Sequence, residues 1–397
     1  MKTGVGGFQP QRLTQAREAL GLTKVALATL VNVSSATVTQ WESGKQNPQE
    51  DKLQALASAL GQASHWFLKP VHESVNGAYF YRALSAATKG GRTVTKTKLN
   101  WIIELSQSLE KFVDWPKYKL PALDKPFTSI SDEEIEEMAL EYRNVAGLGS
   151  GPIKDLMLSA ESSGVICARS EIGYDKLDGL SNWNFDDQRA YILLASDKDN
   201  GIRSRFDLAH EIGHMVLHRS MPVEKLTIQN HKEIERQANL FASSLLLPES
   251  GFAKELNSPT LETFLTLKPR WKVSMAAMIF RAHSLGILTD LQYSNLYKNL
   301  SAKGWRSKEP YDEQVRPEKP KLLHRAVDML VNAGMSKADL LEILGLQESM
   351  IEEFADLPKG FFSDNIDVDN LLAFKKINME SNQSNKFIGN NIYKFER

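Results

Sequence analysis

The stretch His210-Glu211-Ile212-Gly213-His214 places two histidines four residues apart, with a glutamate next to the first. On an α-helix, residues four apart lie on one face, so His210 and His214 can hold one metal ion with two imidazole nitrogens. Glu211 can then reach a water at the metal and act as its general base. The apolar residues around these three predict a helix that is buried on one side. The stretch therefore predicts half of a zinc-hydrolysis site, which still needs a third protein ligand.

The third ligand is expected downstream, in residues 231–242. A helix over this segment places Glu235, Ala238, Asn239 and Ala242 on one face. Because two of these residues are alanines, the helix can approach the first helix closely, which brings Glu235 into range of both histidines. We therefore predict Glu235 as the third ligand.

Three neighbouring residues are weaker candidates for this position. His231 and Glu233 do not share the alanine face. His218 lies four residues beyond His214, but about 12 Å along the helix axis from His210 at about 1.5 Å per residue. One ion therefore cannot bind all three of these histidines on a straight helix.

The front of the chain, up to residue 68, carries short helical patterns separated by tight turns. Thr23 is placed to cap a second helix, and Ser34 is placed to cap a third over Ser35 to Glu42. A fourth helix is expected from about Glu50 to Leu60. Helix, short turn and helix, with small polar residues on the outer face of the second, is the pattern of helix-turn-helix domains that read the major groove.

Inside this module, Val25, Ala26, Leu27 and Leu30 of the second helix are expected to be buried, together with Val38 and Trp41 of the third. The residues expected to contact DNA lie at the helix caps and on the outer face of the third helix: Thr23, Lys24, Ser34, Ser35, Ala36, Thr39, Gln40 and Lys45. A glutamine such as Gln40 can address adenine by two hydrogen bonds.

The segment 69–128 has the composition of a basic helical linker, with an amphipathic helix from roughly Thr95 to Val113 and an aromatic cluster at Tyr79-Phe80-Tyr81. Its basic residues are Lys89, Arg92, Lys96, Lys98, Lys111, Lys117, Lys119 and Lys125. They are either solvated helix faces or a source of non-specific attraction to phosphates.

Ahead of the metal helix, three strand-like runs cover Val165 to Ser170, Gly179 to Trp183 and Ala190 to Ala195. Helices, strands and then a metal helix make an α+β layout. A small sheet there could present its edge to an extended peptide. The chain as a whole is predicted to be mainly α with this one small sheet.

Composition limits the class of protein further. The 397 residues have 42% hydrophobic and 24% charged residues and a net charge of −1, which is typical of a globular protein with two or three domains. The apolar runs are too short to span a membrane, and the N-terminus does not resemble a signal peptide. The single cysteine, Cys167, excludes an internal disulfide. These features favour the cytoplasm.

The front module resembles the Cro/repressor type of helix-turn-helix, the XRE family. The matching residues are Leu22-Thr23, Leu27-Ala28, Val33-Ser34, Val38, Trp41-Glu42-Ser43-Gly44 and Pro48. The resemblance implies an all-α DNA-binding domain over residues 1–68 with a double-stranded operator as its partner. Because the module's own charge is only slightly positive, DNA binding is expected to rely on a homodimer and on helix N-termini that hold phosphates.

A second resemblance begins at the metal helix. Arg205-Phe206-Asp207-Leu208-Ala209-His210-Glu211-Ile212-Gly213-His214 is followed by residues 235–242 and by Leu245-Leu246-Leu247-Pro248. Together these segments are similar to the ImmA/IrrE family of zinc metallopeptidases. That family implies a zincin-like α+β domain, placed here at 129–310, with His210, His214 and Glu235 as Zn²⁺ ligands and Glu211 as general base. A helical region at 311–376 and a flexible tail at 377–397 are expected to follow.

The two modules in one chain support more than one function. The first hypothesis is a transcriptional regulator with an active zinc endopeptidase, which cleaves a repressor protein or its own DNA-binding end in response to a signal. The alternative is a DNA-binding regulator whose zinc fold is a sensor or a structural domain without proteolysis. A third option, a cytosolic peptidase that uses its front module only for protein contacts, is the weakest.

Overall fold

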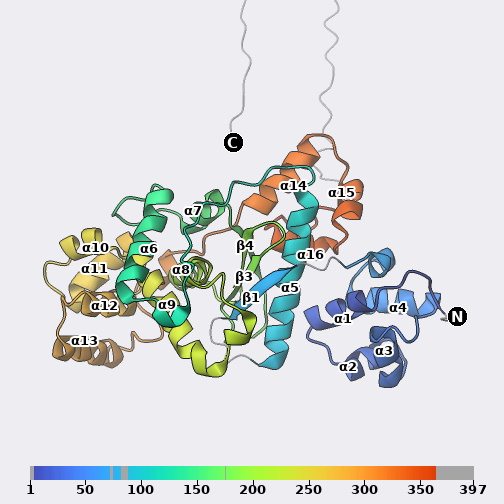
Figure 1. The fold of residues 1–397 in the computed structure, drawn as a ribbon, viewed down its shortest axis with the longest axis horizontal. Coiled ribbons are helices and arrows are strands. Elements are labelled where there is room, and N and C mark those ends of the chain that lie inside the picture. The colour runs from blue at the N-terminus through green and yellow to red at the C-terminus, as the bar shows by residue number, and fades with distance from the viewer. Residues whose placement is uncertain (1–3, 72–74, 82–87, 175, 364–397) are drawn as a thin grey trace, which may run out of the picture. The chain divides into compact units, whose positions relative to one another are not determined.

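The computed structural model describes residues 4–71, 75–81, 88–174 and 176–363. The tail expected at 377–397 lies outside the described residues. The described part is mainly helical with one small four-stranded sheet, which confirms the predicted fold class (Figure 1).

The helices of the front module are α1 (Pro10–Ala19), α2 (Lys24–Leu30), α3 (Ser35–Glu42) and α4 (Glu50–Leu60), followed by the 3₁₀ turn η1 (Ser64–Leu68). The predicted caps form: the Thr23 hydroxyl accepts a hydrogen bond from the Ala26 amide at 3.1 Å, and the Ser34 hydroxyl accepts one from Thr37 at 3.1 Å. Each cap satisfies an amide that has no partner within its helix.

The core of the front module confirms three of the six predicted burials. Leu27, Val38 and Trp41 are buried and Ala26 is half-buried, but Val25 and Leu30 are 63% and 58% exposed. The prediction for these two was wrong because α2 has only two turns, and its inward face is taken by Leu27 and its neighbour Ala28.

The sheet consists of β1 (Asn76–Tyr81), β2 (Ile166–Ser170), β3 (Gly179–Asn184) and β4 (Arg189–Ala195) in the order β1-β3-β4-β2. β2 and β4 pair in parallel, whereas β3 pairs antiparallel with both β4 and β1. The three predicted strands are confirmed.

The strand β1 was not expected. It lies inside residues 69–128, which therefore do not form a purely helical linker. Tyr79, Phe80 and Tyr81 favour extended backbone, and pairing with β3 supplies the partner that makes a strand of them. The helix of this segment, α5 (Lys89–Leu109), also begins earlier than predicted.

Both faces of the sheet are covered, because two separate apolar cores meet it. Cys167, Ile192 and Leu194 face one core, which α8 (Gly201–Leu217) shares. Residues from alternate positions of the same strands, such as Ile166 and Leu193, face a second core that includes α5. Figure 1 shows α5 and α8 on opposite sides of the strands.

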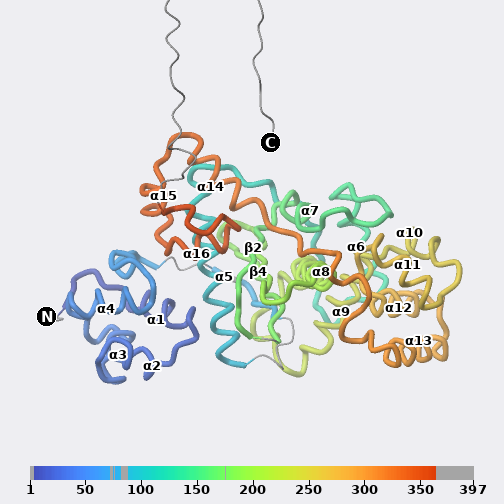
Figure 2. The backbone as a smooth tube through the Cα atoms, turned by 180° about the vertical axis from the view of Figure 1, so that it is seen from behind, coloured from blue at the N-terminus to red at the C-terminus, as the bar shows by residue number. Residues whose placement is uncertain are grey.

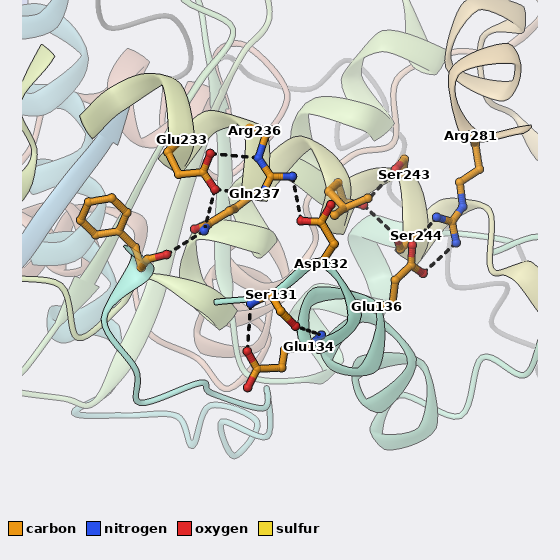
Figure 3. A network of polar contacts seen from close by, with 12 residues as sticks. Ser131, Asp132, Glu134, Glu136, Glu233, Arg236, Gln237, Ser243, Ser244 and Arg281 are labelled. Atoms are coloured by element: carbon orange, nitrogen blue, oxygen red, sulfur yellow. Dashed lines mark hydrogen bonds and ion pairs between the residues drawn. The ribbon is translucent and has the colours of Figure 1, made fainter. Parts of the chain in front are cut away.

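The metal helix α8 packs against α9 (Ile228–Leu246), which in turn packs against α6 (Asp132–Val145). Polar contacts link α6 to α9: the Arg236 guanidinium lies 2.8 Å from Asp132 Oδ1 and also donates to Glu233 (Figure 3). Glu136 of α6 forms an ion pair with Arg281. The contact between Asp132 and Arg236 holds α6 against α9.

The remaining helices surround this centre. They are η2 (Phe127–Ser129), α7 (Leu156–Ser162), η3 (Val223–Lys225), α10 (Glu249–Glu255), α11 (Leu261–Trp271), α12 (Met275–Ser284), α13 (Asp290–Ala302), η4 (Asp312–Gln314), α14 (Leu322–Asn332), α15 (Lys337–Leu344) and α16 (Glu348–Phe354). α14 and α16 contact β2, as Figure 2 shows from behind. Among the helices described, none is both long and apolar enough to span a bilayer.

Candidate metal centre and nucleic-acid interface

His210, His214 and Glu235 come together as a group of possible metal ligands. The Nε2 atoms of the two histidines are 3.1 Å apart. Glu235 Oε2 lies 3.3 Å from His210 Nε2, and its Oε1 lies 3.2 Å from His214 Nε2. Both imidazoles are fully buried, whereas the Glu235 side chain is 17% exposed. The predicted third ligand therefore lies where the argument from the alanine face placed it.

These separations fit a tetrahedral zinc site. With zinc–nitrogen distances of about 2.0 Å, neighbouring ligand atoms of a tetrahedron lie roughly 3.3 Å apart. Three donor atoms at 3.1 to 3.3 Å match that spacing. Two imidazoles and one carboxylate are also the donor set of catalytic zinc sites, which leave one position open.

The helix packing that brings the ligands together depends on a close approach at Gly213 of α8. A Cβ atom at this position would lie 3.1 Å from Phe241 Cδ1 and 3.3 Å from the carbonyl oxygen of Ala238 on α9. Since only a glycine leaves this space open, Gly213 and Ala238 together let the two helices approach. That approach carries Glu235 to the histidines.

A chain of hydrogen bonds orients His214. The Gln237 amide nitrogen donates to the Phe127 carbonyl at 2.7 Å and to Glu233, so the Gln237 oxygen faces His218 Nε2 at 2.9 Å. His218 is then protonated at Nε2, and its Nδ1 accepts from His214 Nδ1 at 3.1 Å. This assignment, made from the network, leaves the Nε2 lone pair of His214 facing Glu235.

His210 is oriented in the same way by another residue of α9, since its Nδ1 lies 3.0 Å from Asn239 Oδ1. Burial lowers the pKa of His214 to about 4 and the pKa of His218 to about 3. Burial acts to raise the pKa of Glu235, but the contacts with His210 and His214 outweigh it and hold that pKa well below its usual range. A neutral His214 and an ionised Glu235 are the protonation states in which such groups bind a metal.

The candidate base, Glu211, is fully buried beside β3. The Ser181 hydroxyl donates to Glu211 Oε2 at 2.6 Å. A Cβ atom at Gly179 would lie 3.1 Å from Glu211 Oε1, so β3 approaches the carboxylate closely. The arrangement holds Glu211 on the strand side of the metal helix.

A cavity of about 820 Å³ lies beside the centre. Its walls include His218, Leu123, Phe127 and Met221, so it is partly apolar and meets the orienting chain of His214. The aromatic ring of Phe80 covers the centre from the sheet side, stacked on the His214 ring at a centroid distance of 4.7 Å.

The helix-turn-helix module presents the predicted reading face. Ser35, Ala36 and Gln40 of α3 are exposed, and so is Lys45 beyond its end. Other predicted contact residues have local roles in addition: Thr39 is exposed but its hydroxyl donates to the Ser35 carbonyl at 3.0 Å.

The two caps and the lysine beside them are also partly engaged. The hydroxyls of Thr23 and Ser34 accept helix amides, although both residues are exposed. Lys24 Nζ lies 3.1 Å from Glu42 Oε2, and Glu42 also pairs with Arg17 at 2.5 Å. We therefore keep Gln40, Ser35 and Ala36 as the residues that are best placed to read bases.

Sequence reasoning missed the residues that orient the ligands. It treated His218 only as a rejected ligand, and it did not assign roles to Gln237 or Ser181. The spacing of His218 four residues after His214 was a usable signal, because it places the two rings on one helix face. Ser181 and Gln237 carry no comparable signal, since their contacts arise only from packing.

Comparison with known families agrees with this geometry. Residues 13–67 match a helix-turn-helix family model, and residues 163–283 match the model of the IrrE N-terminal-like domain. No curated protein matches the chain. The chain is thus an XRE-type helix-turn-helix module fused to an ImmA/IrrE-like metallopeptidase domain, as the two resemblances predicted. It is a DNA-binding regulator with a protease-like domain.

Proposed function

We propose that the protein is a transcriptional regulator whose zinc-dependent endopeptidase domain cleaves a repressor protein, or the chain itself, in response to a signal. We further propose that it acts as a homodimer in the cytoplasm and binds a double-stranded operator. The observation that carries the proposal is the group His210, His214 and Glu235 with Glu211 beside it, in the same chain as an exposed reading helix.

The chemistry follows from the residues around the centre. When bound, Zn²⁺ lowers the pKa of a coordinated water to about 7 and polarises a carbonyl group. Glu211 takes a proton from the attacking water and passes it to the leaving amine. The Ser181 hydroxyl fixes one carboxylate oxygen of Glu211, which keeps the base in one rotamer during both transfers.

Domain organisation makes such a cut a switch on transcription. We propose the boundaries 1–68 for the DNA-binding domain, 129–310 for the metallopeptidase domain and 311–376 for the C-terminal helices. A dimeric DNA-binding protein loses most of its affinity when its halves part. Cleavage of a repressor, or of this chain between its domains, would therefore release an operator.

The alternative is a zinc fold that senses a ligand or only supports structure. His231 favours it, because its Nδ1 lies 3.9 Å from Glu235 Oε1 and could approach as a fourth protein ligand. A site with four protein ligands would be closed to water. Glu211 favours the enzyme, since a closed site has no use for a buried carboxylate beside it.

Zinc analysis tests the ligand set. Wild-type protein should bind one zinc, and Glu235→Ala should lose it, while His231→Ala should retain it. Retention of zinc by Glu235→Ala would exclude Glu235 as a ligand. Loss of zinc in His231→Ala would favour the closed, structural site.

Proteolysis tests the activity. Purified protein with zinc is mixed with candidate repressors, and products are identified by mass spectrometry for the wild type and for Glu211→Gln. Cleavage by the wild type alone is the expected result. Equal cleavage by both proteins would remove Glu211 as the base, and no cleavage by either would favour the sensor.

A further inference from the structure

We propose that β1 occupies the peptide-binding groove of the metal centre as a built-in inhibitory strand, and that it must leave before a substrate can bind. This inference rests on the proposed endopeptidase function. The strand belongs to the segment between the DNA-binding module and the metallopeptidase domain.

β3 lies beside the metal helix and the candidate base. β3 contacts the metal helix α8, and its Ser181 holds Glu211 at 2.6 Å. An extended peptide that is to reach Glu211 would bind along the edge of β3 that β4 does not occupy, by main-chain hydrogen bonds. The side of β3 away from β4 is the one that β1 takes, antiparallel, with Phe80 opposite Ser181.

β3 holds β1 through main-chain groups of β1. The Asn182 side-chain amide donates to the main-chain carbonyls of Gly77 at 3.0 Å and Ala78 at 3.2 Å. Asn182 is fully buried. Hydrogen bonds to carbonyls do not depend on the side chains of the bound strand, so the same amide would serve any extended peptide.

β1 also contacts one of the candidate metal ligands directly. The Phe80 ring lies parallel to the His214 ring within 14°, at 4.7 Å between centroids, and 5.9 Å from the His218 ring. Phe80 is only 1% exposed. The strand thus presents a phenyl ring, and not one of its peptide bonds, to His214. It is therefore placed to block the centre and not to be cut by it.

The opposite face of β1 is tied to α5. The Tyr79 hydroxyl donates to Asn100 Oδ1 at 2.6 Å, and the Tyr81 hydroxyl donates to the Arg92 carbonyl at 3.3 Å. Tethering keeps β1 near its groove at an effective concentration on the order of mM, well above what most free substrates reach. An inhibitory strand of this kind needs no tight intrinsic binding.

A reversible cross-link tests the proposal. Tyr81 and Leu180 are register partners of an antiparallel pair, so cysteines at both positions fall within reach of a disulfide. They lie on the face of the sheet away from the buried Cys167. The full-length double variant Tyr81→Cys/Leu180→Cys is loaded with zinc, and binding of a fluorescent synthetic peptide with the sequence of residues 75–81 is followed by anisotropy.

The oxidised variant should not bind the peptide, and reduction should restore an affinity at least as high as that of the wild type, because the variant also lacks the Tyr81 tether to α5. Wild type treated with the same oxidant is the control. A second variant, Phe80→Gly, removes the ring from His214 and should bind the peptide at least tenfold more tightly than wild type. Peptide binding by the oxidised form, or unchanged affinity in Phe80→Gly, would overturn the proposal.

Cleavage of a repressor or of a generic peptide by the same proteins separates this inference from the proposed function. If only the reduced form binds the peptide and neither form cleaves a substrate, the proposed endopeptidase function is wrong, whereas the proposal that β1 occupies the groove is supported. If cleavage is equal in the oxidised and reduced forms, the endopeptidase stands and the inhibitory strand is wrong.

Discussion

Replacing His218 by alanine should weaken zinc binding although His218 is not a ligand. His218 accepts the hydrogen bond from His214 Nδ1 at 3.1 Å and is itself fixed by Gln237 at 2.9 Å. Without it, the buried His214 ring loses the partner that sets its tautomer and its rotation. The ligand nitrogen would then face the metal in only part of the molecules.

The expected magnitude follows from the burial of the pair. Removing the partner of a zinc-binding histidine costs about 10- to 100-fold in metal affinity, which is roughly 1.4 to 2.7 kcal/mol. The loss of one hydrogen bond in a buried site, about 1 to 3 kcal/mol, gives the same range. His214 and His218 are 0% and 2% exposed, so water cannot easily replace the lost partner.

Zinc affinity is measured by competition with a chromophoric chelator, and folding is checked by circular dichroism in the absence of zinc. His283→Ala is the matched control, because His283 lies on α12 and pairs with Asp290 at 2.8 Å. His218→Gln should recover part of the affinity, since an amide oxygen can accept the same hydrogen bond. A folded His218→Ala protein with wild-type zinc affinity would refute the orienting chain.

Three further changes test other parts of the molecule. Gln40→Ala should cost about 1–3 kcal/mol on a selected operator and little on random DNA; equal loss on both in anisotropy titrations would mean that Gln40 only contacts the backbone. Gly213→Val should cost about 1–3 kcal/mol of stability and weaken zinc binding, because its Cβ would meet Phe241 at 3.1 Å; unchanged urea denaturation would contradict this. Burial raises the pKa of Glu161 from 4.5 to about 7, so the folded carboxyl stays protonated where the unfolded one ionises. The free energy of unfolding should therefore fall by on the order of 3 kcal/mol as the pH rises from about 4 to 7.5, and Glu161→Gln should lose this fall; the same pH dependence in both proteins would exclude Glu161 as its source.

Local sequence patterns were sufficient to predict the residues on the two helices of the centre. His210 and His214 follow from helical spacing, and Glu235 follows from the face that it shares with Ala238. The caps at Thr23 and Ser34 were equally predictable, because the hydroxyl of a Ser or Thr directly before a helix commonly accepts a hydrogen bond from an amide of the first turn. These predictions succeed because the interacting groups lie within a turn or two of each other, or on two helices with complementary faces.

Only the tertiary structure decided what surrounds those ligands. Gln237 meets His218 because α9 packs on α8, and Ser181 meets Glu211 because β3 lies against the metal helix. No spacing along the chain specifies either contact. Each depends on the angle and distance between elements, which the packing of side chains sets.

The strand β1 shows the same division. By itself the run at Tyr79 to Tyr81 indicates only aromatic residues that favour extended backbone. Its hydrogen-bonding partner lies about a hundred residues further along the chain, at Ser181 and Asn182. Sequence alone placed the candidate metal ligands and the third helix of the front module, because local periodicity encodes the faces of a helix. The tertiary structure alone decided that β1 covers the metal centre. This covering depends on the pairing of β1 with the distant strand β3, and the backbone groups that form the pairing are the same in every residue except proline.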